Sequence, residues 1–118
     1  MKKIEAIIRK TKYEEIKTAL HEIGIDFFSY WEVRGVGKAT QERIYRGIKY
    51  DTSTIERILL SIYVRDKFLQ PTVDTLLKTA RTGEIGDGKI FISDCLDAYR
   101  IRTGEHGDDA LFIKGEQE

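Results

Sequence analysis

The apolar and polar positions change period several times along the chain, and each change predicts an element. Residues 2–9 alternate at a period of two, which is typical of a strand with one buried face. That face consists of Ile4, Ala6 and Ile8. Thr11 and Glu14 have the spacing of a capping box, so we expect a helix to begin there and to end at Gly24.

The middle of the chain predicts two strands separated by a long loop. Aromatic and β-branched residues dominate 25–34, which is strand composition. Residues 38–53 show no sustained apolar period, so we expect a long exposed loop there. Connections of this length are unusual and often functional. A clean alternation then predicts a strand over 55–64.

A second helix and short strands complete the pattern. The apolar stripe of this predicted helix consists of Leu69, Val73, Leu76, Leu77 and Ala80. Pro71 is expected in the first turn, where its missing N–H costs little. After a glycine-rich turn we expect a strand at 90–93, a strand-like piece at 98–102 and a polar, frayed tail over 106–118.

The order of these elements is βαββαβ with a short extra strand. It predicts an α+β, ferredoxin-like sandwich with two helices on one face of an antiparallel sheet. The other sheet face is left bare, and oligomerisation is the simplest way to bury it. The length of 118 residues fits one domain spanning 1–118.

Composition and charge exclude several classes of protein. No stretch approaches 18 apolar residues, which predicts no membrane-spanning helix. The 20 basic and 20 acidic residues cancel, which argues against nucleic acid as the main partner and against an RNA-binding module of this fold. A single Cys95 favours a reducing compartment. His21 and His106 lack the spacing of metal ligands.

The glycine-rich turn carries the strongest chemical signal. Residues 83–89 spell G-x-x-x-x-G-K, the first seven positions of a phosphate-binding P-loop. The eighth position is Ile90 instead of Ser or Thr, and a helix enters the turn where a P-loop has a strand, so a P-loop enzyme is not expected. The glycines and Lys89 can still bind an anion, and Arg100 and Arg102, on one strand face, can converge on it. The alternative is a glycine turn beside two solvated arginines.

Several stretches resemble the PII nitrogen-regulatory signalling proteins. Residues 82–92, TGEIGDGKIFI, resemble the signature of that family, and residues 100–105 resemble its C-terminal loop motif. Residues 1–9 and 32–37 are also similar to it. Tyr-Arg-Gly and a following tyrosine within 45–50 match part of its long exposed loop. The resemblance therefore covers nearly the whole chain.

This resemblance implies a homotrimeric signalling protein that is not an enzyme. It implies ATP or ADP in clefts between subunits, and mobile loops that dock onto ammonium transporters or nitrogen-assimilation proteins. Such a protein is expected in the cytoplasm, or at the membrane only through a transporter and without inserting. Many members also bind Mg²⁺ and 2-oxoglutarate. The alternative function is a slow ATPase that acts as a timer at the same site.

The resemblance also implies the nucleotide site residue by residue. It places residues 86–89 around the phosphates and brings two arginines from the neighbouring subunit. Gly35 and Gly37 match the hinge before the long loop, Ser29 matches a threonine near the nucleotide, and Val64 lies on the strand lining the base pocket. The complete implied set is Ser29, Gly35, Gly37, Val64, Gly86, Asp87, Gly88, Lys89, Arg100 and Arg102.

The long loop departs from the family pattern and appears one residue shorter. Ala39 stands near the place of a family glutamine that holds Mg²⁺ and 2-oxoglutarate, so a displaced Gln41 would have to supply that ligand. Arg57 stands in place of a family lysine and keeps the charge but not the geometry. Binding of 2-oxoglutarate is therefore left open. Arg46 and Tyr50 match residues that contact targets or are modified.

Overall fold

The computed structural model describes residues 1–36, 43–45, 48–50 and 54–111, and its main layer is a four-stranded antiparallel sheet. In sheet order its strands are β2 (Ser29–Val36), β5 (Thr54–Val64), β1 (Lys2–Arg9) and β6 (Lys89–Asp94). The helices are α1 (Tyr13–Glu22) and α2 (Asp66–Ala80), with short 3-10 turns at Lys10–Lys12 and Gly107–Leu111. The predicted α+β class and βαββαβ order are confirmed.

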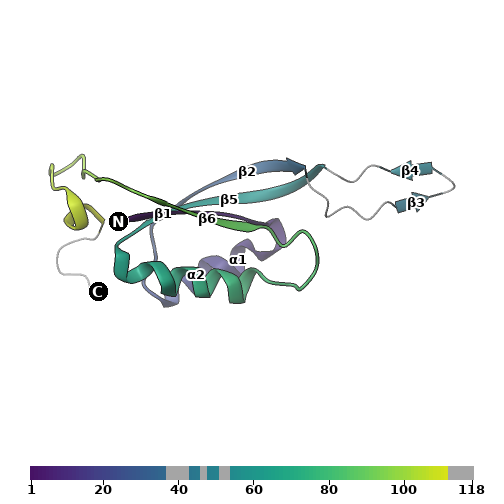
Figure 1. Cartoon of the computed structure of the whole chain (residues 1–118), viewed down its shortest axis with the longest axis horizontal. Helices are drawn as coiled ribbons and strands as arrows, with labels where there is room; N and C mark the ends of the chain where they lie inside the picture. The colour runs from purple at the N-terminus through teal and green to yellow at the C-terminus, as the bar shows by residue number, and fades with distance from the viewer. Residues whose placement is uncertain (37–42, 46–47, 51–53, 112–118) are drawn as a thin grey trace.

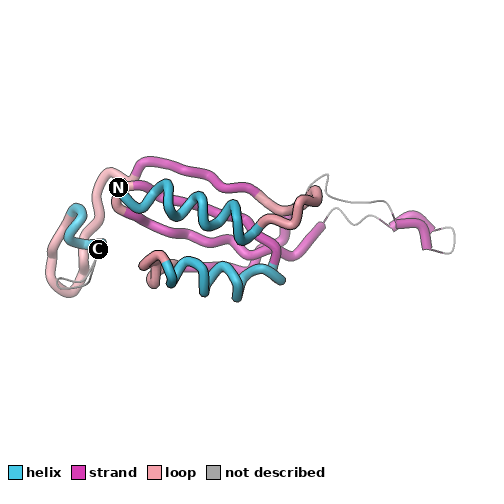
Figure 2. The backbone as a smooth tube through the Cα atoms, turned by 90° about the horizontal axis from the view of Figure 1, so that it is seen from below, coloured by secondary structure: helices cyan, strands magenta, loops and turns pink. Residues whose placement is uncertain are grey.

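Both helices lie side by side against one face of this sheet (Figures 1 and 2). The helices cover this face because β1 and β5 alternate between apolar and polar residues, so each strand presents one apolar row to them. The register pairs Ala6 with Leu60 and Ile8 with Ile58. The buried core consists of Ile4, Ala6, Ile8, Ile16, Leu20, Ile25, Ile58, Leu60, Ile62, Val64 and Leu76.

The opposite face of the sheet carries apolar side chains that the described residues leave partly open. Trp31 pairs with Leu59, which pairs in turn with Ile7, so these three side chains form one row across the strands. Trp31 and Phe91, on this face, are each about half exposed. We call this surface the open face. The predicted bare face is therefore present in the structure.

The start of the first helix was predicted wrongly. The chain first makes a 3-10 turn at Lys10–Lys12, and α1 begins at Tyr13 without a side-chain capping hydrogen bond. Thr11 is therefore not a cap, and the capping box does not form. The predicted end is right, since Gly24 has φ +86° and its N–H donates to the His21 carbonyl at 2.9 Å.

The second strand begins later than predicted, at Ser29, and extends to Val36. The reason lies at Ile25, which is buried in the core and donates its N–H to the Leu20 carbonyl at 2.9 Å. That contact holds the chain against the end of α1, so residues 25–28 form a connection and not a strand.

The long loop predicted for 38–53 contains regular structure. Strands β3 (Arg43–Tyr45) and β4 (Ile48–Tyr50) pair as a separate antiparallel hairpin beyond the end of the main sheet (Figure 1). Pattern reasoning missed it because three residues are too few to show an alternation. Gly37, Ala39, Gln41 and Arg46 lie outside the described residues, and Tyr50 is placed only as part of β4.

Two other expectations about elements are corrected. Pro71 is the sixth residue of α2 and not part of its first turn, because the helix already begins at Asp66, whose carboxylate pairs with the N-terminal amine at 2.9 Å. Residues 98–102 do not form a strand. They enter a turn in which the Gly104 N–H donates to the Arg100 carbonyl at 2.7 Å, so Arg100 and Arg102 do not share a strand face.

Candidate functional site

The glycine turn between α2 and β6 contains backbone positions whose conformation favours glycine. Gly83, Gly86 and Gly88 have φ values of +89°, +104° and +101°, in the left-handed region. A Cβ added to Gly88 would lie 1.7 Å from the carbonyl oxygen of Ile7. The turn therefore lies directly on the backbone of β1, where a side chain could not fit.

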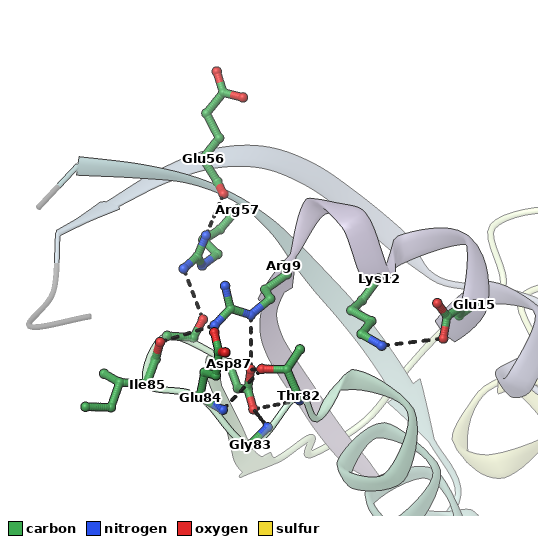
Figure 3. Close-up of polar contacts among 11 residues, drawn as sticks. Arg9, Lys12, Glu15, Glu56, Arg57, Thr82, Gly83, Glu84, Ile85 and Asp87 are labelled. Carbon is green, nitrogen blue, oxygen red and sulfur yellow. Dashed lines mark hydrogen bonds and ion pairs between the residues drawn. The ribbon is translucent and has the colours of Figure 1, made fainter. Parts of the chain in front are cut away.

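A carboxylate at the centre of the turn holds it together (Figure 3). Asp87 accepts hydrogen bonds from the backbone N–H groups of Thr82 (2.8 Å) and Gly83 (2.9 Å) and from the Thr82 hydroxyl. The guanidinium of Arg9 donates to the same carboxylate at 3.0 Å. These donors, the Thr82 hydroxyl foremost, hold the pKa of Asp87 well below its usual range, so this group is a carboxylate at neutral pH.

Two arginines fix the carbonyl groups of the same turn. Arg9, at the end of β1, donates from Nη2 to the Ile85 carbonyl at 3.2 Å. Arg57, on β5, donates from Nη2 to the Gly86 carbonyl at 3.0 Å (Figure 3). Burial and the neighbouring Arg9 lower the pKa of Arg57, but a guanidinium stays charged at neutral pH.

A groove of about 610 Å³ runs along this turn, and most of the predicted phosphate-binding residues meet in it. Its lining includes Gly35 from β2 and the backbone or side chains of residues 86–89. Arg57 also lines it, although the sequence assigned this residue to a different ligand. We call this surface the phosphate groove. It offers an exposed ammonium on Lys89, a guanidinium on Arg57 and the backbone of three glycines.

A second hollow, of about 550 Å³, collects other predicted residues near the opposite end of β2. Its lining includes Ser29, Tyr63 and Arg100, whose Nη2 donates to the Asp109 carbonyl at 3.1 Å. We call it the distal hollow. Val64 does not line it, because that side chain is 3% exposed and belongs to the core under the helices. On β5 the hollow is lined instead by Ser61 and the neighbouring Tyr63.

The phosphate groove and the distal hollow are separate in one chain. Gly35 and Ser29 are six residues apart on β2, which corresponds to about 20 Å of strand. Gly35 and Ser29 lie on the same face of β2 as Trp31, which is the open face of the sheet. Arg102, exposed in the C-terminal turn, lines neither surface.

Sequence reasoning missed Arg9 and Thr82, whose side chains hold Asp87. Neither belongs to the G-x-x-x-x-G-K pattern, and Arg9 is 78 positions away from Asp87 along the chain. Only the strand register brings Arg9 close to Asp87, because β1 pairs Ile7 with Lys89.

In the described part of the chain no group of three or more His, Cys, Asp or Glu residues could hold a metal ion. No helix there is long and apolar enough to span a membrane.

Comparison with known proteins identifies the family. A family model described as "Nitrogen regulatory protein P-II" matches residues 1–105. The chain belongs to this P-II family. It is 45% identical over 112 residues to nitrogen regulatory protein P-II 1 of Methanothermobacter thermautotrophicus, an alignment that covers 94% of this chain and 97% of that protein. It is 42% identical to nitrogen regulatory protein P-II 1 of Escherichia coli K12, covering 94% of this chain and all of that protein.

Membership in the P-II family confirms the resemblance inferred from the glycine turn and the C-terminal motif. It also confirms the predicted class of protein, a regulator of nitrogen metabolism and not an enzyme. The matched residues include the whole of the glycine turn and all of β6.

Proposed function

We propose that this P-II protein senses adenine nucleotides, ATP and ADP, through the phosphate groove. The observation that carries the proposal is the preformed glycine turn, in which Gly88 lies on the Ile7 backbone while Lys89 stays exposed. A turn of glycines with a fixed shape presents backbone N–H groups to an anion at little cost in ordering. Lys89 and Arg57 add positive charge at the same groove.

The complete nucleotide site is proposed to lie between two subunits of a homotrimer. A nucleotide bound at the phosphate groove of one chain would not reach that chain's distal hollow, which lies about 20 Å away along β2. The hollow of a second copy can supply Ser29, Tyr63 and Arg100 instead. The apolar open face, on the side where both surfaces lie, supports an association of this kind.

Signal output is proposed to go through the long segment 38–53 to an ammonium transporter or a nitrogen-assimilation protein. Gly35 and Val36, at the end of the strand that leads into that segment, line the phosphate groove, so a ligand bound there can act on this strand end. Different ligands can signal only if they bind the conformers of this segment with different affinities. Arg57 in the groove is the proposed contact for the carboxylates of 2-oxoglutarate bound with Mg-ATP.

Calorimetry with the full chain tests this function. ATP and ADP are titrated with Mg²⁺, each with and without 2-oxoglutarate, into the wild type and into Lys89→Met. We expect both nucleotides to bind the wild type, and Lys89→Met to weaken ATP by about tenfold or more through loss of a charged hydrogen bond. Tighter ATP binding with 2-oxoglutarate would identify a sensor of carbon and nitrogen status, and no change would identify an adenylate sensor. Absence of nucleotide binding would refute the proposal.

A further inference from the structure

Two acidic side chains line the phosphate groove, the exposed Glu84 and the half-buried Asp87, and the half-buried one is an electrostatic problem. Asp87 lines this groove together with Lys89 and Arg57. An uncompensated carboxylate there would repel a polyphosphate and offset one of the two cations. A phosphate-binding turn that contains an aspartate therefore needs a third cation that neutralises it.

Arg9 is placed to meet this need. Its Nε lies 3.0 Å from Asp87 Oδ1, and both side chains are only 24% exposed, so solvent screens the pair less than a surface pair. Arg9 does not line the groove itself. Its positive charge is therefore directed to Asp87 and leaves the charges of Lys89 and Arg57 for a ligand.

The same guanidinium also fixes the backbone of the turn. While Nε contacts Asp87, Nη2 donates to the Ile85 carbonyl at 3.2 Å (Figure 3). The peptide bonds here are trans, and the N–H of a planar trans peptide points opposite to its carbonyl. Holding the Ile85 carbonyl toward Arg9 therefore also fixes the direction of the Gly86 N–H.

We propose that Arg9 is a positioning residue of the nucleotide site, which neutralises Asp87 and locks the glycine turn in its phosphate-binding shape. This inference rests on the proposed nucleotide function. Arg9 acts through Asp87 and the Ile85 carbonyl and does not touch the ligand. Lysine cannot replace it fully, because a single ammonium lacks the planar fork that reaches both acceptors.

Five variants of the full chain test the two parts of this role. Arg9→Met removes both contacts, Arg9→Lys keeps only the charge, and Asp87→Asn removes the carboxylate charge, alone and combined with Arg9→Met. Lys12→Met is the matched control, because Lys12 is 23% exposed, lies close to Arg9 in the chain and pairs with Glu15 at 3.6 Å, away from the turn (Figure 3). Circular dichroism establishes that each variant is folded, and Arg9→Lys is the test variant should Arg9→Met fail to fold.

Affinities for ATP, ADP and AMP distinguish an electrostatic role from a merely structural one. We expect Arg9→Met to weaken ATP by about tenfold, ADP less and AMP least, because repulsion by Asp87 grows with phosphate charge. Arg9→Met combined with Asp87→Asn should recover part of this loss, Arg9→Lys should be intermediate, and Lys12→Met should bind like the wild type. Equal losses for all three nucleotides with no recovery in the double variant would overturn the electrostatic part.

Hydrogen exchange of the nucleotide-free protein tests the locking part without any ligand. We expect the amides of residues 82–87 to exchange faster in Arg9→Met and at the wild-type rate in Lys12→Met. Unchanged exchange in Arg9→Met would overturn this part. Should the wild type itself bind no nucleotide, the proposed function fails, whereas wild-type binding together with wild-type affinity in Arg9→Met refutes the inference about Arg9 alone.

Discussion

At the scale of single residues, Gly88 is the point where the glycine turn and β1 meet. An added Cβ would collide with the Ile7 carbonyl at 1.7 Å, and φ is +101°, so we expect Gly88→Ala to lower the free energy of unfolding by more than about 2 kcal/mol. Gly83→Ala is the matched control, since φ is +89° but nothing lies within 4 Å of the added atom, and it should cost about 1 kcal/mol. Urea titrations at one protein concentration measure both, and equal losses would contradict the collision.

His21 and Asp26 form an exposed pair that makes stability depend on pH. The hydrogen bond from the ring Nδ1–H to Asp26, and then the charge of this carboxylate, raise the pKa of His21 above its ordinary value. A raised pKa in the folded state means that the stabilisation is complete below about pH 6.5, the unfolded value, and is lost as pH rises through the folded pKa. We expect Asp26→Asn to lower the His21 pKa, measured by NMR titration. An unchanged value in this variant would show that Asp26 is not the cause.

At the scale of elements, α2 carries a buried hydroxyl against the sheet. Thr72 is completely buried, and its Oγ1 has no hydrogen-bond partner among the described residues. Thr72→Val keeps the shape and removes the unpaired polar atom, so we expect it to raise the free energy of unfolding by about 1 kcal/mol. Thr72→Ser, which keeps the hydroxyl and loses the methyl group, should lower it instead. Urea unfolding measures the free energy of unfolding of both variants. Destabilisation by both would mean that the hydroxyl contributes to stability.

Some of these elements could be predicted from the sequence pattern alone, and others could not. β1 and β5 were predicted almost to the residue, because a strand with one buried face must alternate. The start of α1 and the position of Pro71 within α2 were not predicted correctly. At these places local sequence signals compete with contacts between residues that are distant in the sequence. Asp66 begins α2 before the apolar stripe does, and its partner is the N-terminal amine. Such a pairing leaves no trace in the local sequence.

At the scale of the whole molecule, the sequence predicted the parts of the site better than their relation. The G-x-x-x-x-G-K turn was found from its own residues, and the phosphate groove contains it. Arg9 was missed, since only the pairing of β1 with β6 brings it to Asp87. Ser29 and Arg100 were both assigned to the nucleotide site, and they line the distal hollow, away from the phosphate groove of the same chain. One chain alone therefore holds two separate surfaces.

This separation leads to a prediction about association. Leu59 lies in the middle of the open face, between Trp31 and Ile7, so Leu59→Lys places a charge where a second copy would pack. We expect the wild type to sediment as a trimer and Leu59→Lys as a smaller species. Leu77→Lys is the matched control, because Leu77 is an exposed leucine of α2 on the helix side of the sheet, and this variant should remain a trimer.

Nucleotide binding by the same variants then tests whether one chain is enough. If the site needs the phosphate groove of one copy and the distal hollow of another, Leu59→Lys must lose ATP affinity although its glycine turn is intact. Hydrogen exchange at residues 82–87 should therefore match the wild type while calorimetry records the loss. A monomeric Leu59→Lys that binds ATP as tightly as the wild type would mean that the phosphate groove alone is the whole site, and that the distal hollow serves another ligand.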